Sequence, residues 1–129
     1  MIIGIGSDIV NISRIKKLYE QFGDRFINRV FSEAEIKNAQ NKSVHKIAYF
    51  AKRFAAKEAF SKALGTGFRN GLRFKDVEIL NDLLGKPEIH LHAVAKEKLA
   101  SKVKKSKIHL SLSDDEPFAQ AFVVIESLS

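Results

Sequence analysis

The sequence predicts an α+β domain in which a mainly antiparallel sheet packs against one long central helix. Three observations support this fold class. Alternating apolar residues open the chain, a long run without proline or glycine occupies its middle, and short strand-like segments fill its second half. A length of 129 residues suits a single domain, over residues 1–129, with one hydrophobic core. The expected order of elements is β-α-α-α-β-β-α-β-β.

Residues 2–10 are predicted to form the first strand. One face carries its odd-numbered residues, which are mostly isoleucine: Ile3, Ile5, Ser7 and Ile9. Gly4, Gly6 and Asp8 share the other face. Because two of these three positions have no side chain, something bulky has room to lie against this face, beside a carboxylate.

Three helices are expected next. The first is amphipathic, with an apolar stripe and a basic exposed face; the stripe is Ile12, Ile15, Tyr19 and Phe22, and the basic residues are Arg14, Lys16 and Lys17. A capping box, Ser32-Glu33-Ala34-Glu35, starts the second helix, and Phe31 and Ile36 stand where a hydrophobic staple would place them. The third helix runs from about residue 43 to 64 and ends at Gly65, which can adopt the left-handed cap conformation.

The second half of the chain reads as two strand pairs separated by a short helix. The predicted strands are 76–80, 88–92, 107–112 and 119–125, and the helix is 94–102. The first pair flanks a turn that ends in Gly85-Lys86-Pro87, and the second pair forms a hairpin around residues 113–117.

Composition limits the classes of function. The chain has no cysteine, which excludes disulfides and thiolate chemistry and fits a cytoplasmic location. Its apolar runs are much shorter than the roughly 20 residues of a membrane span, and we expect no secretory signal. A formal charge of +7 calls for an anionic partner: nucleic acid, a membrane surface, or an acidic protein together with a phosphorylated small molecule.

The segment from Arg53 to Gly65 is the most informative one for chemistry. Phe54, Glu58 and Lys62 follow one ridge of the predicted helix. A surface ion pair between Glu58 and Lys62, worth a few tenths of a kcal/mol, would explain this spacing. The alternative is a magnesium–diphosphate site, which needs a second carboxylate, and Asp8 could supply it. An aspartate at a strand end is also a common turn or cap residue, so both alternatives stay open.

Other familiar motifs are missing. The third glycine of a dinucleotide-binding fingerprint would fall on Ile9, and neither a Walker sequence nor an H-E-x-x-H pair occurs. His90 and His92 lie on the same face of one predicted strand. An exposed pair of histidines explains this spacing better than a metal site does. Ser111 and Ser113 share one face of their strand, as ordinary half-buried strand patterning would also place them.

Taken together, these segments resemble the holo-acyl-carrier-protein synthases, the short trimeric class of 4'-phosphopantetheinyl transferases. The resemblance covers essentially the whole chain. Its parts are residues 4–10, the highly specific stretch 53–63, residues 85–87, and residues 109–113 followed by 119–121. Two departures concern Asp114, where relatives often have His or Thr, and the segment with Gln21 and Asp24, where some relatives have more arginine.

The resemblance implies a 4'-phosphopantetheinyl transferase fold, a homotrimer with active sites between subunits, and a reaction. The 4'-phosphopantetheine arm of coenzyme A would move to a serine of acidic apo-acyl-carrier protein, releasing adenosine 3',5'-bisphosphate, in support of fatty acid biosynthesis. The implied catalytic residues are Asp8, Glu58 and Lys62, and the implied Mg²⁺ ligands are Asp8 and Glu58. The implied coenzyme A contacts are Arg53, Lys62, Gly65, Lys86, Pro87, His109 and Ser111. The implied carrier-docking residues are Arg14, Lys17 and Arg25.

Two other functions fit part of the sequence. A nucleic-acid-binding module would explain the basic charge, but the chain has no Trp and only two Tyr for base stacking, so neither nucleic acid nor a membrane is the expected partner. An inactive structural trimer subunit would not need Asp8, Glu58 and Lys62, which are all present.

The base that accepts the proton of the carrier serine could be Glu58 acting through a metal-held water, or it could be a metal-bound hydroxide. The sequence does not choose between these two bases.

Overall fold

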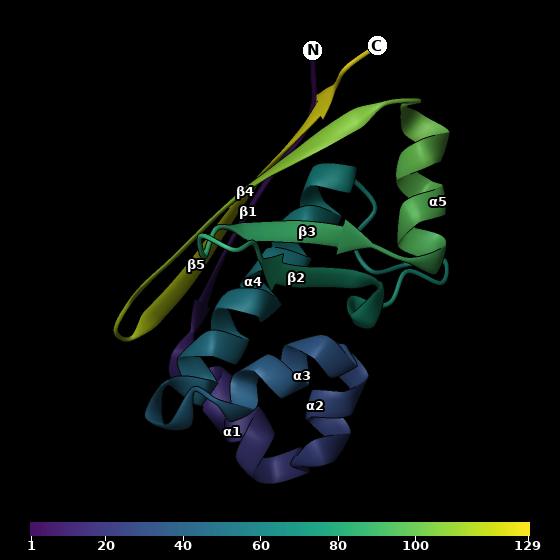
Figure 1. The fold of residues 1–129 in the computed structure, drawn as a ribbon. Coiled ribbons are helices and arrows are strands. Elements are labelled where there is room, and N and C mark those ends of the chain that lie inside the picture. Colours follow the sequence, from purple (N-terminus) through teal and green to yellow (C-terminus); the bar gives the residue numbers. More distant parts are fainter.

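The computed structural model describes all residues from 1 to 129, arranged around one long helix, α4, that lies between two small sheets (Figure 1). In chain order the elements are β1 (Ile2–Asn11), α1 (Ile12–Phe22), α2 (Asp24–Val30), α3 (Glu33–Gln40), α4 (Lys46–Leu64), β2 (Val77–Asn81), β3 (Pro87–Leu91), α5 (Ala93–Lys102), β4 (Ser106–Asp115) and β5 (Phe118–Ser127). Short 3₁₀ turns, Ser43–His45 and Phe74–Asp76, precede α4 and β2. The predicted α+β class is therefore confirmed.

Both sheets are antiparallel. The larger has the strand order β1-β5-β4, so β1 and β4 are its two edges, and the smaller is the β2–β3 pair. Opposite residues in the larger sheet include Asp8 with Ala121 and Ser111 with Phe122. Helices α1, α2 and α3 gather at one end of α4, while α5 lies toward the other end, near the end of β3 (Figure 1).

Helix α4 is the bulky object that lies against the glycine-bearing face of β1. A methyl group on Gly4 would come within 2.0 Å of the Ala63 carbonyl oxygen, and one on Gly6 within 1.9 Å of the Ala59 oxygen. Ala59 is fully buried in this contact. Small residues on both elements therefore let strand and helix approach closely, and the main core forms along this seam.

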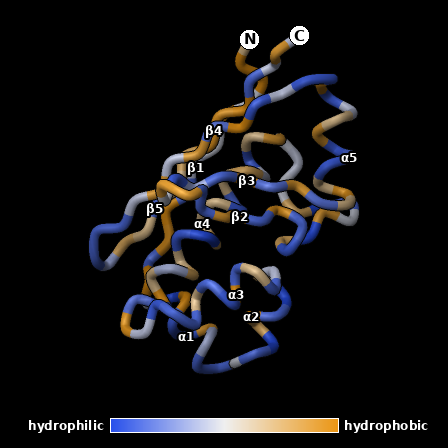
Figure 2. The backbone as a smooth tube through the Cα atoms, viewed as in Figure 1, coloured by the Kyte–Doolittle hydropathy of each residue, from blue (hydrophilic) through white to orange (hydrophobic).

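The apolar residues follow this arrangement. Core side chains from α4, such as Phe50 and Phe60, meet those from the inner face of β5, such as Val123 and Ile125. In Figure 2 the strands of the larger sheet carry hydrophobic stretches, whereas the β4–β5 turn is hydrophilic. No helix in the structure is long and apolar enough to cross a bilayer.

The helical region differs from the prediction in one element. Four α-helices, not three, precede β2, because Gly23 at φ 57° ends α1 and a separate helix α2 follows. The third predicted helix also begins later, since Ser43–His45 form a 3₁₀ turn before α4.

The capping box is confirmed: the Ser32 N–H donates to Glu35 Oε1 (2.8 Å), and the Glu35 N–H donates to Ser32 Oγ (3.2 Å). Gly65 caps α4 at φ 89°, as expected.

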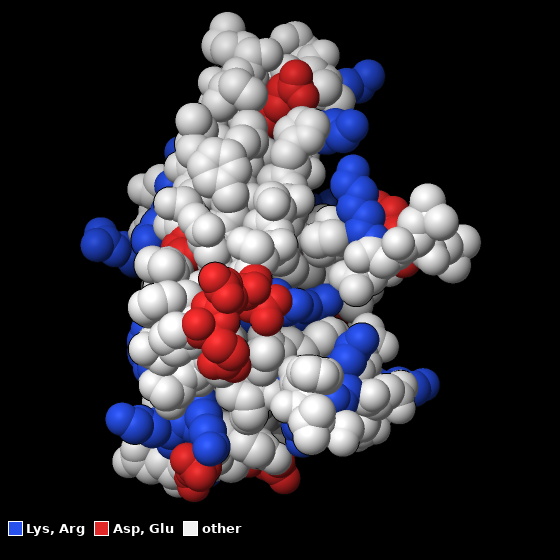
Figure 3. Space-filling model, turned by 90° about the vertical axis from the view of Figure 1, so that its left-hand side faces the viewer, with Lys and Arg blue, Asp and Glu red and all other residues white.

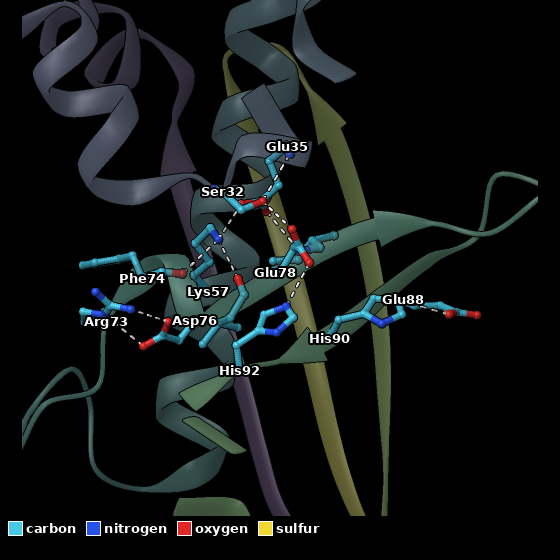
Figure 4. Close-up of polar contacts among 12 residues, drawn as sticks. Ser32, Glu35, Lys57, Arg73, Phe74, Asp76, Glu78, Glu88, His90 and His92 are labelled. Carbon is cyan, nitrogen blue, oxygen red and sulfur yellow. Dashed lines mark hydrogen bonds and ion pairs between the residues drawn. The ribbon is translucent and has the colours of Figure 1, made fainter. Parts of the chain in front are cut away.

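A buried ion pair ties three elements together (Figure 4). Lys57 and Glu35 have fully buried side chains, and Lys57 Nζ lies 2.9 Å from Glu35 Oε1. The Lys57 ammonium also donates to the carbonyl oxygens of Phe74 and Val77, and Glu35 Oε2 accepts the Ile79 N–H. Burial lowers the pKa of Lys57, and the Glu35 carboxylate opposes that shift. Because removal of either partner would leave a buried charge without compensation, the pair fixes α4 against α3 and β2.

Candidate active site

The structure brings Asp8, Glu58 and Lys62 together where the edge strand β1 meets α4. Lys62 Nζ donates to Asp8 Oδ1 and to the Ser7 carbonyl oxygen, each at 3.0 Å. The Asp8 side chain is 17% exposed, and that of Lys62 is 53% exposed. Lys62 thus pairs with Asp8 from another element, and no ion pair joins it to Glu58, which decides against the simple i,i+4 pair.

The electrostatics of Glu58 follow from the same geometry. Burial raises the pKa of Glu58, and the neighbouring charge of Asp8 raises it further. The cations of Lys62 and Arg14 partly offset these effects on the pKa. Two carboxylates and two cations therefore share one small region, which is a setting typical of sites that bind a metal and phosphate groups.

Arg14 connects helix α1 to this region. Its guanidinium carbon lies 5.5 Å from the centre of the Phe54 ring, one turn before Glu58 on α4. Lys17 is exposed on the same helix. Arg25, by contrast, belongs to α2 and lies 5.9 Å from the Phe22 ring, so the three docking residues do not share one helix. The reason is again the break at Gly23.

Arg53 lies at a second place, in a cavity of about 290 Å³ that also involves β2 and β4. Its side chain is only 4% exposed, stacks 3.7 Å from the centre of the Tyr49 ring, and donates to Asn81 Oδ1 (3.1 Å). Its Nε atom is buried without a hydrogen-bond partner. Burial lowers the pKa of Arg53. A buried donor of this kind favours an anionic ligand.

Sequence reasoning missed most of this cavity. Its lining includes Lys42, His45, Lys52 and Asp114, and Lys52 Nζ lies 3.2 Å from Asp114 Oδ1. Only the position of Lys52, directly before Arg53, gave a signal that a second cation would be close. The approach of Asp114 depends on how the β4–β5 hairpin packs, which no local pattern reveals.

Lys86, Pro87 and His109 line a third place, a cleft of about 660 Å³ between β3, α5 and β4. His109 Nε2 lies 3.0 Å from Glu126 Oε1, and this hydrogen bond lowers the pKa of Glu126. His90 and His92 lie beside different glutamates, Glu88 and Glu78. No group of three or more His, Cys, Asp or Glu side chains is arranged to hold a metal by itself.

The remaining predicted contacts lie apart from these three places. Ser111 is exposed on the outer face of β4, and Gly65 caps α4 one turn beyond Ser61. Neither the Arg53 cavity nor the β3–α5–β4 cleft is lined by Asp8, Glu58 or Lys62. A single chain therefore does not gather all the predicted residues into one pocket.

Comparison with known proteins identifies the family. Residues 4–123 match the model of the 4'-phosphopantetheinyl transferase superfamily. The chain is 52% identical over 131 residues to a holo-[acyl-carrier-protein] synthase of Zymomonas mobilis, with 98% of each chain covered. A relative of the same name from Caulobacter sp. is 50% identical, covering 100% of this chain and 98% of the relative.

Solved structures agree. The fold is similar to the crystal structure of holo-[acyl-carrier-protein] synthase from Neisseria meningitidis, with a TM-score of 0.87, 42% identity, and 98% and 100% of the two chains covered. It is also similar to the Helicobacter pylori synthase in complex with coenzyme A, with a TM-score of 0.81, 37% identity, and 95% and 99% covered. The chain therefore belongs to the 4'-phosphopantetheinyl transferase superfamily, and within it to the holo-[acyl-carrier-protein] synthases.

Proposed function

We propose that this protein transfers the 4'-phosphopantetheine arm of coenzyme A to a serine of an apo-acyl-carrier protein. The observation that carries the proposal is the meeting of Asp8, Glu58 and Lys62 at the edge of β1, in a chain of this family. In the reaction the serine oxygen bonds to the β-phosphorus of coenzyme A. The bond from that phosphorus to the bridging oxygen breaks, and adenosine 3',5'-bisphosphate leaves. The holo-carrier protein would serve fatty acid biosynthesis in the cytoplasm.

We infer that Mg²⁺ is the cofactor and that Asp8 and Glu58 would hold it. The residues fit this ion, because Mg²⁺ takes one or two protein carboxylates and completes its shell with phosphate oxygens and water. The Lys62 ammonium already stands as a cation against Asp8 and the Ser7 oxygen, so this place attracts positive charge. When bound, the metal would supply charge that stabilises the leaving diphosphate oxygen.

The side chains of this chain have separate tasks in the proposed reaction. Lys62 provides a positive charge next to the transferred phosphoryl group. Glu58 is proposed to accept the serine proton through a water held in the same site. Arg53, with its unpartnered Nε, and the residues Lys86, Pro87 and His109 are proposed to hold the nucleotide end of coenzyme A.

We further propose that the active protein is a homotrimer whose sites lie between subunits. The outer face of the larger sheet is apolar and exposed, and its large members are Ile3 (38%), Ile5 (60%), Ile9 (63%), Phe118 (46%) and Phe122 (43%). Figure 3 looks toward this side of the molecule, whose upper part carries few charged groups. Monomers rarely leave such a face open, and a second copy would cover it. His109 and Ser111 of β4 share the same face, where a neighbour would meet them.

The carrier protein is proposed to dock on α1, because Arg14 links that helix to the surroundings of Glu58. Acidic carriers complement this basic surface, and attraction between them would raise the association rate.

The direct test mixes the purified protein with coenzyme A, Mg²⁺ and an apo-carrier protein and weighs the carrier by mass spectrometry. We expect the carrier to gain one phosphopantetheine arm. Asp8→Asn and Glu58→Gln keep the side-chain shapes and should slow the transfer by about a hundredfold or more. The exposed Glu33→Gln is the matched control and should remain active. A carrier of unchanged mass with the wild-type protein would reject the proposed function.

A further inference from the structure

Lys62 occupies a position that the proposed metal would need. Its ammonium lies 3.0 Å from both Asp8 Oδ1 and the Ser7 carbonyl oxygen, and these are the ion pair and hydrogen bonds that it makes in the structure. Both acceptors are hard oxygens of the kind that Mg²⁺ takes as ligands. An ammonium ion and a divalent cation repel each other strongly at such distances, so they cannot both bind these oxygens.

The rest of the side chain allows Lys62 to leave without disturbing the fold. Its side chain is 53% exposed, so little packing would be lost if it turned away. The helix that carries it is held independently, by the contacts of Ala59 and Ala63 with Gly6 and Gly4. A lysine has a flexible stem and a compact ammonium group, so it can move from one anion to another while its backbone stays in place.

We propose that Lys62 is a tethered competitor of the metal, which blocks Asp8 in the ligand-free chain and is drawn away when a diphosphate arrives. This inference rests on the proposed function, because the diphosphate of coenzyme A provides the alternative anion. In the ligand-free protein, a divalent ion must displace Lys62 and therefore binds weakly. Once a diphosphate offers Lys62 another partner, Asp8 becomes available, and metal and coenzyme A strengthen each other's binding. By linkage, the two ligands must raise each other's affinity by the same factor.

The test measures metal binding rather than activity. Mn²⁺ is titrated into the ligand-free protein at about pH 8, where ordinary carboxyl groups are ionised, and free Mn²⁺ is followed by electron paramagnetic resonance. Lys62→Gln removes the competing charge and should lower the Mn²⁺ dissociation constant by about tenfold or more. Lys62→Arg keeps a cation within reach of Asp8 and should bind Mn²⁺ as weakly as the wild type does.

Arg14→Gln is the matched control for the electrostatic effect of removing one positive charge near the proposed metal site. Arg14 also acts on Glu58, but it makes no ion pair with Asp8. If Arg14→Gln improves Mn²⁺ binding as much as Lys62→Gln does, removal of a nearby positive charge is sufficient without displacement, and the inference is overturned. Displacement at Asp8 predicts a clearly larger improvement for Lys62→Gln.

A second arm separates this inference from the proposed function. Wild-type protein is titrated with Mn²⁺ in the presence of coenzyme A, and Asp8→Asn is measured in the same way. If coenzyme A strengthens Mn²⁺ binding and Asp8→Asn abolishes that binding, the proposed metal site stands. Unchanged Mn²⁺ affinity in Lys62→Gln would then refute only the competition. If coenzyme A has no effect on wild-type binding and Asp8→Asn binds Mn²⁺ normally, the proposed site itself is wrong and the inference falls with it.

Discussion

Asp8 and Glu58 are both carboxylates, yet their surroundings differ. Asp8 has a cationic partner in Lys62, whereas Glu58 is half-buried on α4 with no ion pair of its own. The consequence is a difference in ionisation that residue type alone would not reveal. In the metal-free chain Asp8 is paired with Lys62, whereas burial and the charge of Asp8 raise the pKa of Glu58.

The raised pKa of Glu58 predicts how transfer depends on pH. Because Glu58 must be ionised to act, kcat/KM for coenzyme A should fall on the acid side at a higher pH than the ordinary carboxyl value of about 4.3 would give. Arg14 lowers this pKa, so Arg14→Gln should move the acid limb to still higher pH. Steady-state rates across the acid range at sub-saturating Mg²⁺ measure both effects. An acid limb that Arg14→Gln leaves in place would contradict this assignment.

Arg14 also predicts the behaviour of the carrier protein. Arg14→Glu should raise the KM for the carrier strongly, leave the KM for coenzyme A almost unchanged, and flatten the dependence of the rate on salt. The physical reason is that a reversed charge on α1 repels an acidic partner. Kinetics in which one substrate is varied at a time measure the two KM values. Equal losses toward both substrates would mean that Arg14 supports the site itself.

At the scale of elements, the seam between β1 and α4 places the catalytic groups. Gly6→Ala would bring a methyl group within 1.9 Å of the Ala59 oxygen, so strand and helix would have to separate. We expect a loss of roughly 1–3 kcal/mol in the free energy of unfolding, as for other overpacked cores. Transfer should also slow, because Asp8 would move relative to Glu58. Urea unfolding and the transfer assay measure the two effects.

Ser7→Ala is the matched control for this seam, since Ser7 is exposed on the opposite face of the same strand. It should change the free energy of unfolding by no more than about 0.5 kcal/mol. Equal stability of Gly6→Ala and Ser7→Ala would show that the seam tolerates a wider spacing.

Most elements could be predicted from the sequence because their signals are local. The capping box at Ser32 and the glycine cap at Gly65 depend on neighbouring residues and were confirmed. Helix α2 was missed because its seven residues are too few to show a periodicity. The second role of Glu35 was missed for another reason: the sequence explains it as a cap residue, whereas its contacts with Lys57 and Ile79 arise only when distant elements pack.

The same distinction holds for the candidate site. Glu58 and Lys62 lie in the one specific motif, and Asp8 was added to them by the family resemblance; the structure brings the three side chains together. The Arg53 cavity could not be predicted beyond Arg53 and its sequence neighbour Lys52, since Asn81 and Asp114 reach it from the ends of strands. Their positions depend on tertiary packing, which has no local pattern.

At the scale of the whole molecule, the separation of the Asp8–Glu58–Lys62 region from the Arg53 cavity predicts complementation between subunits, if each active site takes one of these two halves from each neighbour. Asp8→Asn disables one half and Arg53→Ala disables the other, so each variant alone should be almost inactive. In oligomers formed by refolding an equal mixture, about a quarter of the interfaces would join two intact halves, as expected for a head-to-tail ring. The transfer assay should therefore recover a comparable fraction of wild-type activity, and light scattering should report a trimer. Persistent inactivity of the mixed oligomers, or an active monomer, would contradict the shared site.

The two ends of the chain lie side by side at one tip of the molecule (Figure 1). The Ser127 N–H donates to the Met1 carbonyl oxygen at 2.7 Å, so the termini are already joined by the sheet. A short peptide linker could therefore close the backbone into a circle without moving any strand. A circular chain has fewer unfolded conformations, and the chain-entropy model gives a stabilisation on the order of 5 kcal/mol. Such a protein should melt at a higher temperature while its active-site geometry remains unchanged, because the closure acts on the unfolded ensemble alone.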